Sequence, residues 1–397
     1  MMPGTLSIAT AANHVWEALV IGAGPAGAVA ARQMALTGTR VLLVDAKSFP
    51  RQKVCGACLN SRALTLLHDL GLRDIVTSLG GEPIRQLQIR SVRREAQLAL
   101  PEGLAVSRSQ LDAAFVTAAV AAGAEFLPET TAVVGAPCGG EQDGCRVVSL
   151  RSSAPVASGG PVLVQARVVL VADGLGHLSL KNYPEFASQV TEQAHIGVGG
   201  QVPAAPENYA PGTIFMAVGR QGYVGLVRIE NGALNIAGAL SPEFLKSTGG
   251  TGPAVQAVLH EAGFPAIEAL PQVDWQGTVP LTRRSASTAG ERVLLLGDAA
   301  GYVEPFTGEG MAWALSAAAT VAPVVARGIS GWNEAVEQDW QRTLRQLVTR
   351  RQRWCRTLAF GLRRPWLVRL LLQAVALMPA LARPIIGSVN RPIAPTD

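Results

Sequence analysis

The stretch from Val20 to Gly27 reads V-I-G-A-G-P-A-G, and it constrains the fold more than any other part of the chain. It follows a short apolar run and opens a segment of helical composition, 25–37. Gly22, Gly24 and Gly27 have the spacing of a phosphate-binding turn. Such a turn needs a tight bend, a close approach of the backbone to a pyrophosphate, and close packing of helix on strand. The stretch therefore predicts a dinucleotide site rather than a glycine-rich turn without a ligand.

Further apolar runs are typical of strands buried on both faces, and each ends in an acidic residue. These runs are 40–44 before Asp45, 168–172 before Asp173-Gly174, and 292–296 before Gly297-Asp298. Ligands collect at the carboxyl ends of parallel strands, so one extended dinucleotide can contact all of these turns. Asp45 lies about 20 residues after the glycine-rich turn, where such sites carry the acid that binds a ribose.

Length and composition favour an α/β protein with more than one domain. The chain has 397 residues, 48% of them hydrophobic, which suffices for two or three domains with a sizeable core. Its five cysteines argue against a disulfide framework and for a reducing compartment. No basic segment followed by an apolar run opens the sequence, so we predict no signal peptide and expect a cytoplasmic protein, with membrane association left open.

The middle of the chain predicts a second unit built on an antiparallel sheet. Alternating apolar and polar residues at 84–90 and 95–100 indicate paired, half-buried strands. Further strand-like segments occupy much of 195–277. Between these regions, an Ala-rich helix is expected with Ser107 or Ser109 as its N-cap.

The glycine-rich turn and the acidic strand ends resemble those of the FAD-dependent oxidoreductases of the geranylgeranyl reductase and p-hydroxybenzoate hydroxylase superfamily, over roughly residues 16–326. The resemblance implies that the glycines take the FAD pyrophosphate, Asp45 the adenosine ribose and Asp298 the ribityl chain. Arg108, in the segment S-R-x-x-L-D, would reach the cofactor, and Asp173 belongs to a second fingerprint with a structural or nicotinamide-related role. The residues implied to bind FAD are Gly22, Gly24, Pro25, Ala26, Gly27, Asp45, Ala46, Lys53, Arg108, Asp173, Gly297, Asp298, Gly308, Gly310 and Met311.

The stretch 297–311 reads G-D-A-A-G-Y-V-E-P-F-T-G-E-G-M and is the most specific part of the resemblance. Aromatic hydroxylases of the superfamily usually carry His where this chain has Gly301, and the G-E-G ending is more similar to the geranylgeranyl reductase branch. Gly308 and Gly310 would let the backbone approach the isoalloxazine edge. The helix that starts near Met311 would point its positive end at the ring.

A Lys-x-Cys-Gly segment lines the flavin in the reductase branch, and Lys53, Cys55 and Gly56 match it. Glu304 and Glu309 flank the expected flavin edge, and each is interpreted either as a proton donor or as a solvated loop acid. The residues expected to act in or shape the catalytic pocket are Cys55, Gly56, Tyr223, Pro305, Phe306 and Glu309.

The predicted substrate sheet departs from the reductase branch. That branch carries a Tyr-x-Trp-x-Phe-Pro segment, of which this chain keeps only Tyr223, and Gly225 stands where the branch has a bulky ring. The glycine predicts a wider cavity or a different occupant. Flavin halogenases of the superfamily carry a Trp-x-Trp-x-Ile segment, which none of the seven tryptophans shows, so halogenation is not expected.

Cys55-Gly56-Ala57-Cys58 has the spacing of a redox dithiol. A flavin-dependent thiol–disulfide reductase would also need a second nucleotide fingerprint, and the sequence has no other G-x-G-x-x-G. We therefore favour a flavin-lining or packing role over dithiol chemistry. A zinc site would need a second pair of ligands, which Cys138 and Cys145 do not supply, so no metal site is predicted.

The C-terminal tail has its own charge pattern. Eleven arginines and one acidic residue lie in 340–397, so this region carries a charge of +10 and the rest of the chain −5. Apolar residues recur at three- and four-residue intervals in 332–358, which predicts an amphipathic helix, and 365–382 is more apolar. The tail is interpreted as lying on a membrane surface, covering a lipophilic substrate tunnel, or capping the protein's own core. Nucleic-acid binding is not expected, and the sequence does not predict the oligomeric state.

These observations predict an α/β fold: a Rossmann-type FAD-binding domain, an inserted antiparallel-sheet substrate domain and a helical C-terminal tail. The expected boundaries are 16–83, 105–182 and 281–330 for the FAD-binding domain, 84–104 and 183–280 for the substrate domain, and 331–397 for the tail.

The expected reaction is hydride transfer at a carbon–carbon bond of a lipophilic or polyketide-like small molecule. The alternatives are hydroxylation of an aromatic substrate and a non-catalytic, FAD-binding electron relay. No second standing dinucleotide site is visible in the sequence, so NAD(P)H or another transient electron donor is expected to reduce the flavin.

Overall fold

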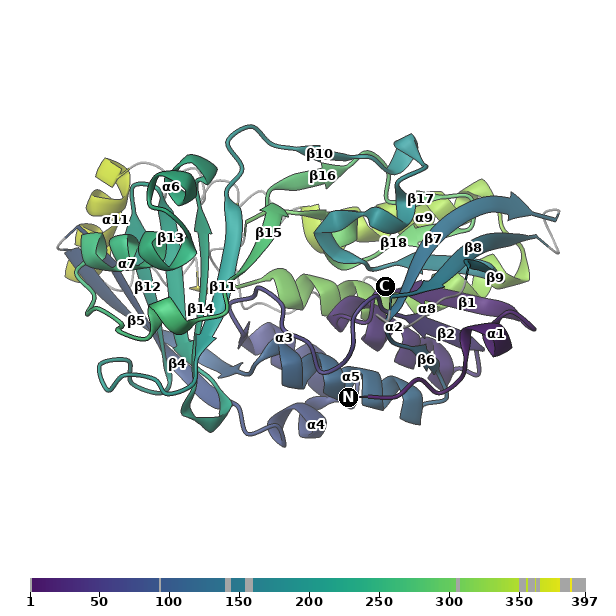
Figure 1. The fold of residues 1–397 in the computed structure, drawn as a ribbon, viewed down its shortest axis with the longest axis horizontal. Coiled ribbons are helices and arrows are strands. Elements are labelled where there is room, and N and C mark those ends of the chain that lie inside the picture. The colour runs from purple at the N-terminus through teal and green to yellow at the C-terminus, as the bar shows by residue number, and fades with distance from the viewer. Residues whose placement is uncertain are drawn as a thin grey trace.

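The computed structural model describes residues 2–92, 94–139, 144–153, 160–304, 308–349, 355, 361, 365–378 and 386–387. Two large sheets organise it and occupy opposite halves of the molecule in Figure 1. One half is a mainly parallel sheet packed with helices, and the other is a mainly antiparallel sheet. The predicted class, a Rossmann-type α/β domain with a second sheet domain, is confirmed.

The first sheet has the strand order β17-β18-β9-β1-β2-β6, and β18, β9, β1, β2 and β6 are parallel. Alternate residues of β1 enter two different cores. Ala18 and Val20 face the helices, whereas Leu19 and Ile21 face the layer beneath the β7–β8 hairpin. Burial on both faces explains why these strands are continuous apolar runs. The strands are β1 (Val15–Ile21), β2 (Val41–Val44), β6 (Glu125–Leu127), β7 (Thr130–Cys138), β8 (Cys145–Ser152), β9 (Val162–Val171), β17 (Ala289–Gly290) and β18 (Val293–Leu295).

Several helices cover one face of this sheet and build its core. The long apolar helix α8 packs on α2, α3 and α9. It is the one helix in the described part of the chain that is long and apolar enough to cross a membrane, yet most of it is buried within the protein. The helices on this side are α2 (Pro25–Leu36), α3 (Ser61–Asp69), α4 (Arg73–Thr77), α5 (Arg108–Ala121), α8 (Gly310–Ser330) and α9 (Glu334–Leu344), and α1 (Ile8–Ala11) precedes the sheet.

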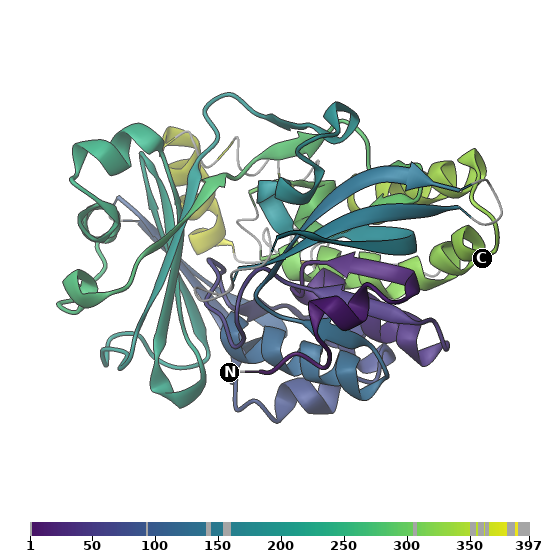
Figure 2. The same cartoon turned by 45° about the vertical axis from the view of Figure 1, so that its right-hand side comes forward.

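The second sheet has the order β15-β11-β14-β13-β12-β4-β5-β3 and is antiparallel except where β12 meets β4. Helices α6 (Pro242–Ser247) and α7 (Thr251–Ala262) lie on its outer side, away from the first sheet and its helices (Figures 1 and 2). Its other face is turned toward the first half. The strands are β3 (Cys58–Leu59), β4 (Glu82–Ser91), β5 (Arg94–Ala105), β11 (Ile196–Val202), β12 (Thr213–Gly219), β13 (Gly222–Arg228), β14 (Leu234–Leu240) and β15 (Gln276–Pro280).

A small third sheet links the halves, and it consists of β10 (Ser188–Val190), β16 (Arg283–Ser285) and β19 (Gly301–Tyr302). The two stretches expected to form the substrate domain contribute β4, β5 and β11 to β15 to the second sheet. The domain boundaries themselves stay a prediction.

The predicted Ala-rich helix is present as α5, and its N-cap is Ser107, whose hydroxyl accepts from the backbone N–H of Gln110 at 3.2 Å. An oxygen at this position satisfies one of the N–H groups that a helix start leaves without an intrahelical partner. The cap fixes where α5 begins, and Arg108 is therefore its first residue.

One expectation about the cysteines needs correction. Cys138 and Cys145 form a disulfide across the β7–β8 hairpin, because their strands pair directly. The odd number of cysteines did not indicate this bridge, because the other three, Cys55, Cys58 and Cys355, are not part of it.

The predicted amphipathic tail helix is present in part as α9, followed by a π-helical segment, Arg345–Thr349. Its apolar face packs on the protein's own core: Trp340 is fully buried and donates to the carbonyl of Leu295 at 3.0 Å. A membrane-facing role for α9 is therefore wrong, and the cap interpretation holds for it. Trp354 and Leu358, which extend the pattern, lie outside the described residues.

Candidate active site

The glycine-rich turn connects β1 to α2, and its three glycines are needed for different reasons. Gly22 has a φ of +102°, and a Cβ there would lie 2.3 Å from the carbonyl oxygen of Ala172. A Cβ on Gly27 would lie 1.8 Å from the carbonyl oxygen of Gly22. At Gly24 the nearest atoms to such a Cβ are guanidinium nitrogens, at 3.5 and 3.7 Å. The protein itself thus requires Gly22 and Gly27, whereas Gly24 leaves space for a ligand.

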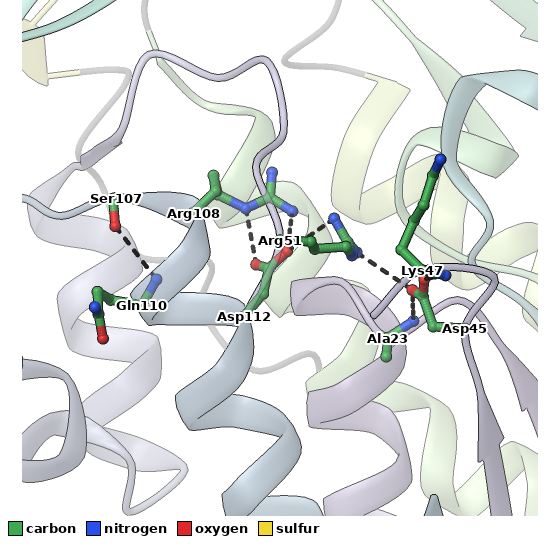
Figure 3. Close-up of polar contacts among 8 residues, drawn as sticks. All are labelled: Ala23, Asp45, Lys47, Arg51, Ser107, Arg108, Gln110 and Asp112. Carbon is green, nitrogen blue, oxygen red and sulfur yellow. Dashed lines mark hydrogen bonds and ion pairs between the residues drawn. The ribbon is translucent and has the colours of Figure 1, made fainter. Parts of the chain in front are cut away.

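Two arginines face this space, and Figure 3 shows the cluster that holds them. Arg108 donates two hydrogen bonds to Asp112, both 2.8 Å long. Arg51 lies between two carboxylates, 3.3 Å from Asp112 and 3.3 Å from Asp45. Burial lowers the pKa of Arg108, but the negative charge of Asp112 outweighs it and the pKa is raised. The Arg108 guanidinium is therefore held charged beside Gly24, and the carboxylates of Asp45 and Asp112 hold the Arg51 guanidinium next to it.

The predicted ribose ligand, Asp45, ties the end of β2 to the turn. Its carboxylate accepts from the backbone N–H of Ala23 at 2.8 Å and of Lys47 at 2.9 Å. The side chain is buried at the carboxyl end of β2, which is the position predicted from the sequence. Ala46, also expected to bind the cofactor, is exposed, and its carbonyl accepts from Ser153.

The end of β18 adjoins the Gly-rich turn, and both line the cavity. Gly297 has a φ of +58°, and a Cβ there would lie 2.9 Å from Ala26, so the two turns are in close contact. Asp298 lines the cavity beside Lys53. Burial and the nearby Arg108 lower the pKa of Lys53, while Asp298 acts in the opposite direction.

These groups fit the pyrophosphate and ribityl parts of FAD. Gly24 leaves an open cradle at the N-terminus of α2, where backbone N–H groups favour an anion. The Nε of Arg51 is buried and has no hydrogen-bond partner among the described residues, as a donor reserved for a ligand would. Asp298 and Lys53 add one acceptor and one donor to the lining of the same cavity.

Asp173 does not share this role. Its carboxylate accepts from the backbone N–H of Ser179 at 3.1 Å and from the Ser179 hydroxyl at 2.7 Å. The cavity wall is formed instead by its neighbours Ala172, Gly174 and Leu175. Asp173 therefore holds a turn after β9, which agrees with the structural part of its expected role.

The expected flavin edge is built from Gly308, Gly310 and Met311, which line the same cavity at the start of α8. Glu309 is 2% exposed and its carboxylate accepts from the thiol of Cys355, so it is not the solvated loop acid that was considered. It is not among the cavity-lining residues. Pro305 and Phe306 lie outside the described residues.

Cys55, Gly56 and Cys58 line the cavity, as expected, and the two cysteines are not bonded to each other. The Cys58 thiol donates to the carbonyl of Gly56 at 3.0 Å. Burial, with a smaller contribution from Cys55, raises the pKa of Cys58. A thiol that resists ionisation is a poor nucleophile, which favours the flavin-lining role over dithiol chemistry.

We therefore expect Cys58→Ser to keep turnover within a few-fold of wild type, because serine retains the donor to the Gly56 carbonyl. Reductive titration of the FAD-loaded protein should show no long-wavelength thiolate–flavin absorbance in either form. A band of this kind in wild type that disappears in the variant would establish the redox dithiol instead.

Beyond the expected flavin edge the cavity continues along the inner face of the second sheet. The whole cavity, with its cofactor-binding end included, has a volume of about 420 Å³. Helix α11 (Pro365–Leu377) closes it and packs on β5. Tyr223 and Gly225 of β13 lie in its wall, and a Cβ on Gly225 would lie 3.3 Å from the Met216 methyl group. The apolar lining comprises Ile84, Leu87, Ile89, Leu98, Leu100, Ile214, Met216, Leu226, Leu281, Val368, Leu371, Leu372 and Val375.

A buried polar network borders the apolar wall. His195, just before β11, lies with Nδ1 3.2 Å from the carboxylate of Glu304, and both side chains are buried. The Tyr223 hydroxyl hydrogen-bonds to Glu304 as well. Glu304 was considered as a proton donor or a solvated acid, and its burial removes the second interpretation.

The comparisons with known proteins agree with this geometry. Residues 16–189 match the model of the FAD binding domain family. The chain is an FAD-dependent oxidoreductase, and its likeness to the geranylgeranyl reductase and p-hydroxybenzoate hydroxylase superfamily is confirmed.

Among individual relatives, a menaquinone reductase of Mycobacterium tuberculosis is 29% identical over 321 residues, which covers 75% of this chain and 74% of the relative. A digeranylgeranylglycerophospholipid reductase of Methanopyrus kandleri is 26% identical over 341 residues, 82% of each chain. Among solved structures, a triple mutant of the flavin-dependent brominase Bmp2 matches with a TM-score of 0.76 at 16% identity, over 96% of each chain. This last likeness concerns the fold alone.

The sequence interpretation missed three residues of the site: Arg51, Asp112 and His195 as a partner of Glu304. Arg51 and Asp112 had a signal, because each lies within six residues of an expected cofactor ligand. His195 had none, since it is 109 residues from Glu304 in the chain.

Proposed function

We propose that this protein is an FAD-dependent reductase that saturates a carbon–carbon double bond in a lipophilic, isoprenoid-like substrate. The observation that carries the proposal is the cavity, which runs from the cofactor-binding turns along an apolar wall to α11. Its volume suits a small organic ligand or part of a longer chain. The names of two relatives, a menaquinone reductase and a digeranylgeranylglycerophospholipid reductase, support a substrate of this class.

In this proposal the residues of the chain bind and orient the cofactor and place charges around it. FAD, when bound and reduced by NAD(P)H or another transient donor, supplies the hydride. Gly24, Arg51 and Arg108 hold the pyrophosphate, and Asp298 and Lys53 hold the ribityl region. The N-terminus of α8, at Gly310, places positive partial charge at the expected flavin edge.

Helix α11 closes the other end of the cavity and keeps water from the reacting carbons. Val368 and Leu372 are buried against the sheet, while Leu371 and Val375 complete the lining. An apolar lid of this kind strengthens the electrostatic interactions inside the cavity, because it lowers the local dielectric constant.

The opposite side of α11 supports peripheral membrane contact as part of the proposal. Leu370 and Leu377 are 57% and 79% exposed, and Met378, directly after the helix, is 58% exposed. Exposed apolar residues beside the lid of a lipophilic cavity would allow a substrate to pass from a bilayer into the cavity.

A second candidate function is hydroxylation of an aromatic substrate. It is favoured by Gly225, because the nearest side chain in the wall there is the flexible Met216, which can move aside to admit a ring.

One experiment tests the first proposal against the second. The FAD-loaded protein is reduced without oxygen and mixed with menaquinone or an unsaturated isoprenoid lipid. We expect a product with two added hydrogens at one double bond and reoxidation of the flavin that depends on the lipid, because the hydride has an acceptor in the cavity. Oxygen-dependent formation of a hydroxylated phenol, without saturation of any lipid, would favour the second. Reoxidation that no substrate stimulates would indicate an electron relay.

A further inference from the structure

Saturation of a double bond adds a hydride to one carbon and a proton to the other, and the proton needs a donor at the cavity wall. Among the described residues that line the cavity, Tyr223, Tyr302 and Thr278 carry hydroxyl groups, and that of Thr278 already donates to the carbonyl of Val279. Tyr223 is the one that also belongs to the central strand β13 and hydrogen-bonds to the carboxylate of Glu304.

We propose that Glu304 and His195 form a buried proton-supply pair that acts through the Tyr223 hydroxyl, which delivers a proton to the substrate. The inference rests on the proposed reductase function and names the acid of the reaction. Tyr223 is the catalytic residue because it lines the substrate cavity, and Glu304 and His195 act through it.

The surroundings of Tyr223 explain why such a pair is needed. Burial raises the pKa of Tyr223, and Glu304, Tyr302 and Cys355 raise it further. A lone buried tyrosine is therefore a poor acid, because its phenolate would be left in an apolar wall beside a carboxylate. A partner that hands over its own proton as Tyr223 donates removes the need to form that phenolate.

The pair has the geometry to do so. Glu304 is 3% exposed, and it lies between the Tyr223 hydroxyl and Nδ1 of His195, 3.2 Å away. Its backbone N–H donates to the Thr282 hydroxyl at 3.4 Å, which helps to fix the residue after β19. A proton on the His195–Glu304 pair can pass to Tyr223 without a large movement of any of the three side chains.

The atoms balance. The O–H bond of Tyr223 breaks as the C–H bond forms on one substrate carbon, and the hydride adds to the other carbon, so the substrate gains two hydrogens, that is two electrons and two protons. The Tyr223 oxygen takes a proton from the Glu304 carboxyl group as that group takes the proton on Nδ1 of His195, and solvent returns a proton to the imidazole. The reductant is the reduced flavin, replenished by a two-electron donor.

The test compares wild type, Glu304→Gln and Glu304→Asp as full-length, FAD-loaded proteins with the lipid that wild type saturates. Glutamine keeps the size of the side chain but cannot pass a proton. We expect kcat to fall on the order of 100-fold in Glu304→Gln with unchanged KM, and to recover partly in Glu304→Asp. The pH profile of the rate should differ between wild type and Glu304→Gln, whereas a purely structural role of Glu304 would leave the profile unchanged.

A second readout does not depend on turnover. The four tyrosines can be followed by carbon-13 NMR of labelled holoenzyme, with Tyr223→Phe to assign the signal. Removing the Glu304 charge should lower the pKa of Tyr223, so its signal titrates at a lower pH in Glu304→Gln. Tyr209→Phe is the matched control: its hydroxyl donates to Pro265 in the outer core, burial raises the pKa of Tyr209 to about 12, and turnover should not change.

The outcomes separate the two proposals. A wild type that saturates none of the lipids overturns the proposed function and the proton-supply role with it. If wild type saturates a lipid and Glu304→Gln is equally fast or has the same pH profile, the proton-supply role alone is overturned. An unmoved Tyr223 titration in Glu304→Gln contradicts the contact on which that role depends.

Discussion

Gly24→Ala is expected to fold normally and to lose FAD, with the dissociation constant raised roughly 10- to 100-fold. A Cβ at this position lies no closer than 3.5 Å to any other group of the protein, and the φ of −76° suits an L-residue. The methyl group would instead stand in the space between the start of α2 and the guanidinium groups of Arg51 and Arg108. The FAD content of purified protein and a fluorescence titration with added FAD measure the effect.

Gly27→Ala is the matched control, and we expect the opposite pattern. Its Cβ would lie 1.8 Å from the carbonyl oxygen of Gly22, so β1 and α2 would have to separate. The free energy of unfolding should fall on the order of 3 kcal/mol, whereas Gly24→Ala should stay within about 1 kcal/mol of wild type. Full FAD occupancy in Gly24→Ala would show that the pyrophosphate does not approach this turn.

The FAD half of the fold was predictable because its signals are local. The Gly22–Gly27 turn, the acid after 40–44 and the Ser107 cap each depend on residues within a few positions of one another. Local backbone requirements of this kind restrict the sequence strongly, so a single chain reveals them.

The polar clusters were only partly predictable, because they join residues that are far apart. Arg51, in the segment after β2, meets Asp112 of α5, and His195 meets Glu304 where the second and third sheets adjoin. No periodicity in the sequence encodes these pairings. Glu304 was recognised as a candidate acid, but its burial and its partners depend on the fold.

The tail shows the same limit. The apolar spacing that indicated an amphipathic helix in α9 was correct, but the spacing does not say what covers the apolar face. In the structure the core covers it, through Trp340, while α11 covers the substrate cavity. The sequence left a membrane surface, a substrate tunnel and the protein's own core as possible partners of the tail. In the structure, large exposed apolar residues lie on α11 and not on α9.

Leu372→Asp should abolish lipid binding while FAD content stays unchanged. Leu372 is 6% exposed and lines the cavity, so an aspartate there would place a carboxylate in an apolar wall. Because an unpaired buried charge costs several kcal/mol, either the lid opens or the carboxylate displaces the lipid, and affinity falls at least about 100-fold. Lipid affinity is measured in detergent by flavin fluorescence, which separates the cavity from any bilayer.

Leu370→Asp is the matched control on the same helix, because Leu370 is 57% exposed and does not line the cavity. In detergent it should bind lipid and FAD as wild type does. With vesicles it should sediment less than wild type, since a charge on the outer side of α11 opposes insertion of the neighbouring leucines into the interface. Equal losses of lipid binding in both variants would mean that α11 is a structural cap without a distinct inner face. Equal sedimentation of wild type and Leu370→Asp would remove the membrane contact and leave the cavity lid in place.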